Sequence, residues 1–353
     1  MDSGVRVVQK ELAQALKLSQ STISRALANS PLLSPVTREK VQQAAARLGY
    51  VPDPVLSSLN AYVHSKRPIS QGTVLAWLGN SIAPPLSRRQ PDWEAIVFVA
   101  ARNRAAMLGY GLEYFSLHEP KRSLGVLDRI LWSRGVGGLV IGPQPRPHAR
   151  ILLDIARWCA VTVSKTLYTP KVDQISVDHG HEISTCYRKL RGRGYRRIGL
   201  VLSHTFDEKT YGLWRGGYLV EQSRRHVRNP IPVLVCSDSD NKTLVKWMER
   251  HRPDSVITAF EGNRRRLDAL RTAHYRVPHD VGLAFLNLGS SSICNSFSGM
   301  EEPNDEIGHC AIDVLVSRIR NNQRGLPNRR IVHLLEGIWK DGNTVRQASS
   351  PTR

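Results

Sequence analysis

Residues 11–30, ELAQALKLSQSTISRALANS, predict two short helices joined by a tight turn, and no other stretch constrains the fold of this chain as strongly. Leu12 and Leu16 place an apolar stripe on the first helix. Ser19 suits the N-cap of the second helix, whose apolar face carries Ile23. This arrangement predicts a helix-turn-helix, whose second helix lies in the major groove of DNA. An ordinary helical hairpin with a solvated polar face would show the same pattern.

A third helix is predicted after this pair. Ser34 and Pro35 form an N-cap followed by a first helical residue, and Gly49 is placed to end the helix. The segment between them would close a three-helix headpiece. Its expected apolar face consists of Val36, Val41, Ala44, Ala45 and Leu48.

The headpiece resembles that of the lactose-repressor/galactose-repressor family of bacterial transcription regulators. The family signature Val-Ser-x-x-Thr-Val-Ser-Arg-x-Leu is matched by LSQSTISRAL at residues 18–27. Its Thr-Arg-Glu-Lys-Val and Leu-Gly-Tyr-x-Pro elements occur unchanged at Thr37–Val41 and Leu48–Pro52. The resemblance implies a ligand-responsive, sequence-specific transcription regulator, a repressor that binds a palindromic operator as a homodimer.

The polar side chains of the second helix are short or forked, and such groups suit base edges and phosphates. Gln20 and Ser21 begin the helix, so we expect them to reach base edges. Arg25, one turn further on, is expected to reach a guanine or a phosphate. The full set expected to contact DNA is Lys10, Ser19, Gln20, Ser21, Thr22, Ser24, Arg25, Asn29, Ser34, Tyr50, Val55 and Leu59.

Val51–Asn60 matches the hinge of this family. The resemblance implies that the hinge is disordered in the free protein and becomes a helix in the minor groove on the operator. Leu59 matches the family's lever leucine, an apolar wedge that partly unstacks a central base step. The alternative is that Leu59 anchors the linker on the first lobe. Two residues depart from the family pattern, because Asp53 replaces an asparagine near phosphates and Pro54 follows it.

Beyond a polar linker, short apolar runs alternate with amphipathic helical stretches such as 94–110 and 181–195. This alternation predicts a doubly wound α/β architecture. Nine strands are too many for one small sheet, so two lobes are expected. The nine runs are 73–79, 111–117, 137–142, 160–164, 174–178, 197–203, 232–237, 255–260 and 281–287.

The family resemblance continues into this region at Val177-Asp178, Gly194–Ile198, Gly217-Tyr218 and Arg276–Val281. It implies an all-α helix-turn-helix headpiece plus an α/β two-lobed periplasmic-binding-protein-like core around a ligand cleft. The expected domains are a headpiece at 1–50, a hinge helix and linker at 51–71, an effector-binding and dimerisation core at 72–341, and a disordered tail at 342–353. Lobe 1 is expected at 72–165 and 292–323, and lobe 2 at 166–291 and 324–341.

The effector cleft is where the chain departs most from the family. Sugar-binding members often carry an arginine a few residues before the Gly-aromatic pair, but Trp214 stands at that place, with Arg215 beside it. Phe260-Glu261 replaces the family's Asn-Asp pair, and Asn287-Leu288 replaces a frequent Asp-Asp pair. Bidentate contacts to vicinal hydroxyls are therefore partly missing. Trp214 would either stack on a pyranose or aromatic ligand or fill lobe packing. For a carbohydrate-type effector, the expected contacts are Asp178, Trp214, Arg215, Glu261 and Asn287.

Charge does not locate the DNA-binding part. The chain carries a net +20, yet residues 1–60 hold seven basic and four acidic residues, a net of +3 that leaves +17 downstream. The five cysteines have no C-x-x-C spacing, which indicates reduced core residues rather than disulfides or a zinc site. No apolar run is long enough to span a membrane, and the first residues lack a signal-peptide core, so a cytoplasmic location is expected.

Two other classes of protein use a similar α/β pattern. A solute-binding protein would share the two-lobed fold but would need a signal peptide and no headpiece. An enzyme would need catalytic motifs, and the sequence contains no G-x-S-x-G, P-loop, G-x-G-x-x-G or H-E-x-x-H pattern. We therefore expect no enzymatic activity, no cofactor and no metal site. His179 and His181 are expected to be polar surface residues.

Overall fold

The computed structural model describes residues 9–27, 33–48, 50, 73–87, 92–120, 122–237, 239–260, 265–289 and 292–347. The hinge and linker lie outside these residues, as do four expected contacts, Asn29, Val55, Leu59 and Glu261. The side chains of Lys10, Ser21 and Ser24 also lie outside the description. Within the described ranges, no helix is both long enough and apolar enough to cross a membrane.

The headpiece is a three-helix unit with the predicted caps. Its helices are α1 (Gln9–Leu16), α2 (Gln20–Leu27) and α3 (Pro35–Arg47). The hydroxyl of Ser19 accepts a hydrogen bond from the backbone N–H of Thr22 at 3.1 Å. In the same way, Ser34 caps α3 by accepting from the N–H of Thr37 at 3.2 Å. Each cap satisfies a backbone donor that the first turn of a helix leaves free.

The headpiece core confirms most of the predicted apolar face. Leu12, Ile23 and Val41 are completely buried and pack with Ala44 and Ala45.

The prediction that Val36 and Leu48 lie on the buried face of α3 was wrong. Val36 is 75% exposed and Leu48 is 39% exposed. Val36 precedes Val41 by five residues, which puts it about 140° around the helix from the buried stripe. Leu48 is the C-cap, where the chain leaves the helix.

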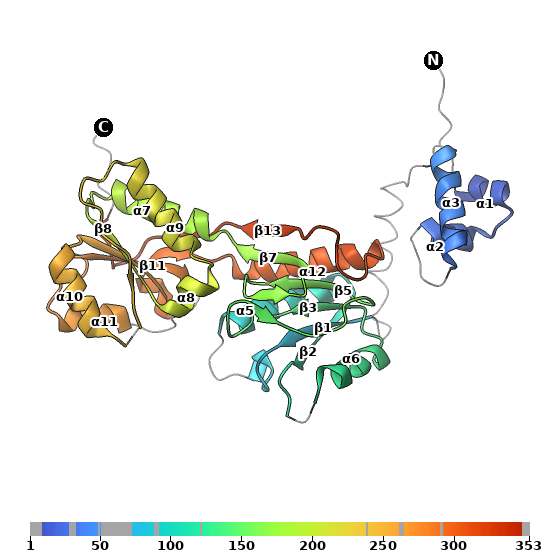
Figure 1. Ribbon diagram of the computed structural model, residues 1–353, viewed down its shortest axis with the longest axis horizontal. Helices are drawn as coiled ribbons and strands as arrows, with labels where there is room; N and C mark the ends of the chain where they lie inside the picture. Colours follow the sequence, from blue (N-terminus) through green and yellow to red (C-terminus); the bar gives the residue numbers. More distant parts are fainter. Residues whose placement is uncertain are drawn as a thin grey trace, which may run out of the picture.

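The first lobe is built on a six-stranded sheet in the order β13-β7-β5-β3-β1-β2, with all neighbours parallel. Figure 1 shows it beside the second lobe. Its elements are β1 (Val74–Gly79), a 3-10 turn (Pro85–Ser87), α5 (Trp93–Met107), β2 (Gly111–Ser116), α6 (Leu124–Ser133), β3 (Gly138–Ile141), β5 (Cys159–Val163), β7 (Asp173–Val177), α12 (Asn304–Arg320) and β13 (Val332–Leu335), with a small separate sheet of β4 (Ala149–Arg150) and β6 (Leu167–Thr169).

The second lobe is built on a sheet in the order β14-β12-β11-β10-β8-β9, in which only the β12–β14 pairing is antiparallel. Its elements are α7 (His179–Gly192), β8 (Ile198–Leu202), α8 (His204–Lys209), α9 (Leu213–Arg224), β9 (Leu234–Val235), α10 (Asn241–His251), β10 (Ser255–Ala259), α11 (Arg265–Thr272), β11 (Gly282–Leu288), a 3-10 turn (Ser292–Ser296), β12 (Ser298–Glu301) and β14 (Ile338–Lys340). All nine predicted strands are present.

The chain crosses between the lobes at Asp178, at 302–303 and at 336–337, so the expected lobe limits need correction. The segment 166–177 belongs to the first lobe, because β7 pairs with β5. The segment 292–301 belongs to the second lobe, because β12 pairs with β11. β13 returns to the first lobe beside β7. Apolar alternation reveals a strand but not the sheet that it joins.

The chain after 341 was expected to be disordered, but its described part packs on the second lobe. Val345 is buried, and the carbonyl of Thr344 accepts a hydrogen bond from the N–H of Leu283 at 2.7 Å. The hydroxyl of Thr344 accepts another from the N–H of Ser298 at 2.9 Å. These bonds attach the segment around Thr344 to β11 and β12.

Two contacts fix α12 in the first lobe. Gly308 lets α12 approach α5 closely, since a Cβ at that position would lie 2.5 Å from the carbonyl oxygen of Val97 and 2.7 Å from the backbone nitrogen of Ala101. At the other end, Arg318 forms an ion pair with Asp173 of β7 at 2.7 Å, and the two side chains are only 7% and 5% exposed. The helix is therefore held to both α5 and the sheet.

Candidate DNA-binding surface and inter-lobe site

The expected DNA-contacting residues fall into two structural groups. Gln20 and Arg25 are exposed on α2, and Thr22 is half-buried beside them. Ser19 and Ser34 are exposed N-caps. These side chains lie at the surface of the headpiece, where they are free to approach a groove.

Tyr50 has a different place in the headpiece. It is half-buried against the core, and its hydroxyl accepts a hydrogen bond from the amide of Gln9 at 3.1 Å. This bond ties the end of the headpiece to the first residue of α1.

The three crossovers between the lobes lie side by side. The N–H of Asp178 donates to the carbonyl of Leu335 at 2.8 Å, which joins the first crossover to the end of β13. One carboxylate oxygen of Asp178 caps α7 by accepting from the N–H of His181 at 2.9 Å. The His181 ring lies 3.4 Å from the carboxylate of Glu336. The expected effector residue Asp178 is therefore part of the junction between the lobes.

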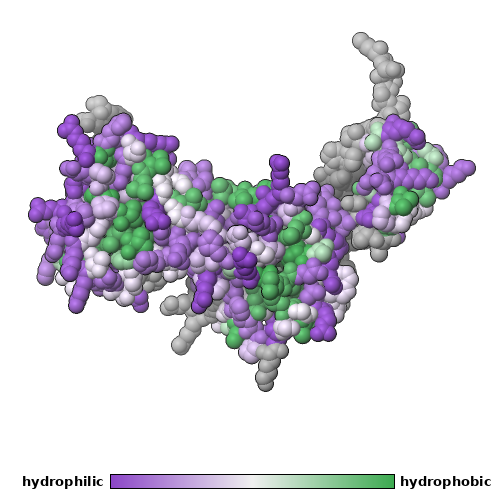
Figure 2. Space-filling model, viewed as in Figure 1, coloured by the Kyte–Doolittle hydropathy of each residue, from purple (hydrophilic) through white to green (hydrophobic). Residues whose placement is uncertain are grey.

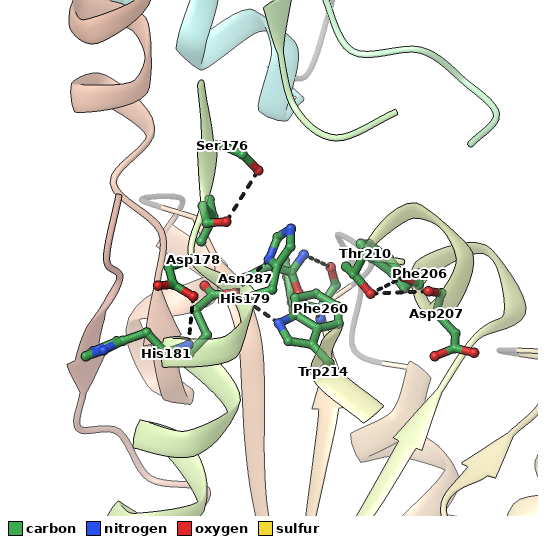
Figure 3. A network of polar contacts seen from close by, with 12 residues as sticks. Ser176, Asp178, His179, His181, Phe206, Asp207, Thr210, Trp214, Phe260 and Asn287 are labelled. Atoms are coloured by element: carbon green, nitrogen blue, oxygen red, sulfur yellow. Dashed lines mark hydrogen bonds and ion pairs between the residues drawn. The ribbon is translucent and has the colours of Figure 1, made fainter. Parts of the chain in front are cut away.

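Trp214 lies inside the second lobe rather than on an open cleft wall. It is 1% exposed, and its indole N–H donates to Oε2 of Glu182 at 3.0 Å. Its ring contacts His179 edge-on at a centroid distance of 5.1 Å and Phe206 at 5.8 Å. Figure 3 shows Trp214 close to His179, with Asn287 bonded to Phe260 nearby. This burial supports the packing alternative for Trp214 over direct stacking on a ligand.

The other two described effector candidates have protein partners. Arg215 pairs with the carboxylate of Asp207 at 3.1 Å. Asn287 adopts a positive φ of 50° and lies one residue before the end of β11. Its amide accepts from the N–H of Phe260 at 2.9 Å and donates to the carbonyl of Phe260 at 3.0 Å. Asn287 thus ties the end of β10 to β11 at the carboxyl edge of the sheet.

The structure adds a group that the sequence analysis missed, and we name it the crossover cluster: His179, Glu182 and Glu302. One ligand-type atom of each residue lies within 4.8 Å of the others. His179 was expected at the surface, but its side chain is only 12% exposed, because α7 begins against the second lobe. The His-x-x-Glu spacing places the first two on one helix face. Glu302 gives no local signal.

Burial dominates the electrostatics of the crossover cluster. It raises the pKa of Glu182 to about 8, which the Trp214 hydrogen bond opposes and the nearby Asp178 reinforces. It raises the pKa of Glu302 to about 8, with Glu182 adding to the effect. It lowers the pKa of His179 to about 4. Near neutral pH the imidazole is uncharged, and the two carboxyl groups resist ionisation.

Among the described residues, one contact ties the first lobe to the second crossover and another ties it to the second lobe. The Trp93 side chain, at the start of α5, forms a hydrogen bond with Glu302. The ring of His148 in the first lobe packs edge-on against Tyr211 of the second at a centroid distance of 4.7 Å. The surfaces that face each other therefore contain both aromatic and hydrogen-bonding groups.

Comparison with known proteins covers both parts of the chain. The model of bacterial regulatory proteins of the lacI family matches residues 9–53, and that of the periplasmic binding protein-like domain matches residues 187–338. An HTH-type transcriptional regulator of Mycobacterium tuberculosis is 30% identical over 368 residues, which cover 96% of this chain and 97% of that protein. The HTH-type transcriptional repressor PurR of Escherichia coli O139:H28 is 23% identical, over 89% and 91% of the two chains.

Solved structures show the same architecture. The lac repressor dimer bound to operator and the anti-inducer ONPF has a TM-score of 0.55 at 17% identity, covering 96% of this chain and 99% of that one. The complex of the transcriptional regulator CelR with cellobiose has a TM-score of 0.56 at 17% identity, covering 96% and 100%. These structures show the fold. The family match of the headpiece and the relative that is 30% identical over nearly its whole length show that the chain belongs to the lacI family of bacterial regulatory proteins and is a DNA-binding transcriptional regulator.

Proposed function

We propose that the chain is a repressor that binds a palindromic operator as a homodimer and responds to a small carbohydrate-type effector held between its lobes. The observation that carries this proposal is the capped headpiece, which presents the polar face of α2 to solvent. One such helix reads only a few base pairs, so two-fold pairing on a palindrome would double the recognised sequence.

The effector proposal rests on the position of Asp178 and Asn287. Asp178 directly follows β7 in the first lobe, and Asn287 lies at the end of β11 in the second. Ligands of open α/β sheets bind at the carboxyl ends of the strands. The CelR structure contains cellobiose and the lac repressor structure contains ONPF, which supports a carbohydrate-type ligand for this chain.

Exposed apolar side chains at β13 and at the start of β14 support the proposed dimer. Ile331, Val332, Leu334 and Ile338 are each more than a third exposed. Figure 2 shows hydrophobic colour along the upper edge between the lobes, where β13 runs. Contiguous apolar surface on a protein is a common site of association.

The test begins with enrichment of bound sequences from random DNA, followed by gel retardation of the selected duplex at several salt concentrations, with and without monosaccharides and disaccharides. Arg25→Ala is expected to weaken binding by about 1–3 kcal/mol if Arg25 contacts a base, or to reduce the salt slope by about one if it contacts a phosphate. Arg134→Ala removes the same charge from an exposed site in the first lobe and is the matched control. An Arg25 variant with unchanged affinity and salt slope would contradict the assignment of α2 as the recognition helix.

Leu59→Ala tests the proposed hinge. We expect dimerisation and effector binding to be unchanged, DNA bending to be lost and operator binding to weaken at least about tenfold, or roughly 1.4 kcal/mol. Bending is measured by the mobility of circularly permuted duplexes. Normal bending and affinity in this variant would favour the alternative in which Leu59 anchors the linker.

A further inference from the structure

The crossover cluster gathers metal-ligating side chains that neither the DNA-binding surface nor the proposed effector contacts use. His179 begins α7 directly after the first crossover, and Glu302 lies in the second crossover. Glu182 lies one turn further along α7, and the ligand-type atoms of all three are within 4.8 Å of one another. The topology therefore brings an imidazole and two carboxyl groups from separate crossovers to one point.

Glu182 has an oxygen that the protein leaves unsatisfied. Its side chain is completely buried, and Oε2 accepts from the indole of Trp214. Oε1 is buried and has no hydrogen-bond partner among the described residues. Because a buried polar atom without a partner is costly and rare, this oxygen indicates that a ligand belongs beside it.

The third crossover passes close to the same oxygen. A Cβ at Gly337 would lie 3.3 Å from Oε1 of Glu182 and 2.8 Å from the carbonyl oxygen of Glu301. Any larger residue at position 337 would therefore press on the backbone of the second crossover and on the unsatisfied oxygen. Glycine lets the third crossover lie against the crossover cluster.

Acidic groups outnumber basic groups around the crossover cluster. Asp178 acts electrostatically on Glu182, and Glu182 acts on Glu302, so three carboxyl groups share this region. Lys165 is a basic side chain that acts on His179. Because burial disfavours the ionised form of both glutamates, a bound divalent ion would supply the positive charge that stabilises them as carboxylates.

We propose that His179, Glu182 and Glu302 bind a divalent transition-metal ion of the zinc class where the chain crosses between the lobes. One imidazole and two carboxylates are a ligand set that Zn²⁺ accepts, with a fourth position for water or a ligand oxygen. Nδ1 of His179 and Oε2 of Glu182 lie 3.1 Å apart, so a metal ion with bonds of roughly 2.0–2.2 Å would replace the hydrogen bond between them. Mg²⁺ and Ca²⁺ prefer oxygen ligands alone and suit the site less well.

The first experiment measures metal binding by the full chain. Protein treated with a chelator and dialysed is titrated with ZnCl₂ in equilibrium dialysis, with an excess of MgCl₂ present. The expected result is one Zn²⁺ per chain that Mg²⁺ does not displace. Glu302→Gln and His179→Asn are each expected to weaken Zn²⁺ binding at least about tenfold, since each removes one of three protein ligands. Wild-type affinity in either variant, or the absence of tight Zn²⁺ binding by the wild type, would overturn the proposal.

Matched controls lie on the exposed face of α12. His309→Asn and Glu306→Gln make the same chemical changes at exposed positions and are expected to keep wild-type Zn²⁺ binding. Loss of binding in these variants instead would assign the metal to the surface and overturn the proposal.

A measurement on the wild type alone covers the case in which a cluster variant does not fold. Co²⁺ in place of Zn²⁺ is expected to give visible bands of nitrogen and oxygen coordination without a thiolate charge-transfer band. A thiolate band would place the metal on the cysteines and contradict the crossover site.

Discussion

Asp173→Ala is expected to destabilise the first lobe by about 3–5 kcal/mol, because it leaves the Arg318 guanidinium buried without its carboxylate. The loss extends beyond one pair. Asp173 also accepts from the N–H of Ile331 at 2.9 Å, just before β13, while Arg318 donates to the carbonyl of Gln323 at 2.9 Å. The variant would therefore loosen α12, β7 and the approach to β13 together. Urea unfolding followed by circular dichroism measures the effect.

Asp313→Ala is the matched control, since Asp313 lies on the same helix and pairs with Arg104 at 2.8 Å in partly exposed surroundings. Exposed pairs contribute about 0–1 kcal/mol, so the control should unfold close to the wild-type midpoint. Equal losses in the two variants would contradict a special role for the buried pair.

Trp214→Ala is expected to cost the second lobe about 3–5 kcal/mol, because it opens a cavity beside Phe206 and His179. It also removes the indole that donates to Oε2 of Glu182. Trp214→Phe keeps most of the apolar volume but loses the donor, so a smaller loss of about 1–3 kcal/mol is expected. Thermal unfolding of both variants tests this order.

Effector titration distinguishes two roles for Trp214, packing inside the second lobe and direct stacking on the ligand. If Trp214 acts through packing, the phenylalanine variant should bind the effector nearly as the wild type does, once its lower stability is taken into account. A stable Trp214→Phe variant with effector binding abolished would instead favour direct contact between the indole and the ligand.

The sequence predicts the strands that lie in long apolar runs, including the edge strands β2 and β9, and misses strands with few large apolar residues. The nine predicted strands are runs of mainly apolar residues, most of them covered on both faces by helices, which gives a strong local signal. β13 is an edge strand whose exposed and half-buried residues alternate, so Val332 and Leu334 gave no such signal. β12 offers Met300 as its one large apolar residue. Assignment to a lobe depends on pairing, which only the three-dimensional structure reveals.

Some features of the candidate sites could also be predicted from local sequence, and others could not. The N-caps Ser19 and Ser34 could be predicted, because a helix cap depends on residues three positions apart. The place of Trp214 followed from its distance to Gly217-Tyr218, but its hydrogen bond to Glu182 did not. Glu302 lies 120 residues beyond Glu182 and reaches it only because the crossovers converge. Such a meeting is set by topology rather than by local pattern.

The close contact at Gly308 has a consequence for how the lobes can move. A helix pair in backbone contact has no layer of side chains through which to slide, so the first lobe resists internal shear. A change in the angle between the lobes must then be absorbed as backbone torsion at Asp178, 302–303 and 336–337. These few residues are also where evolution could retune that angle, and with it the response to an effector, while the packing of both cores stays intact.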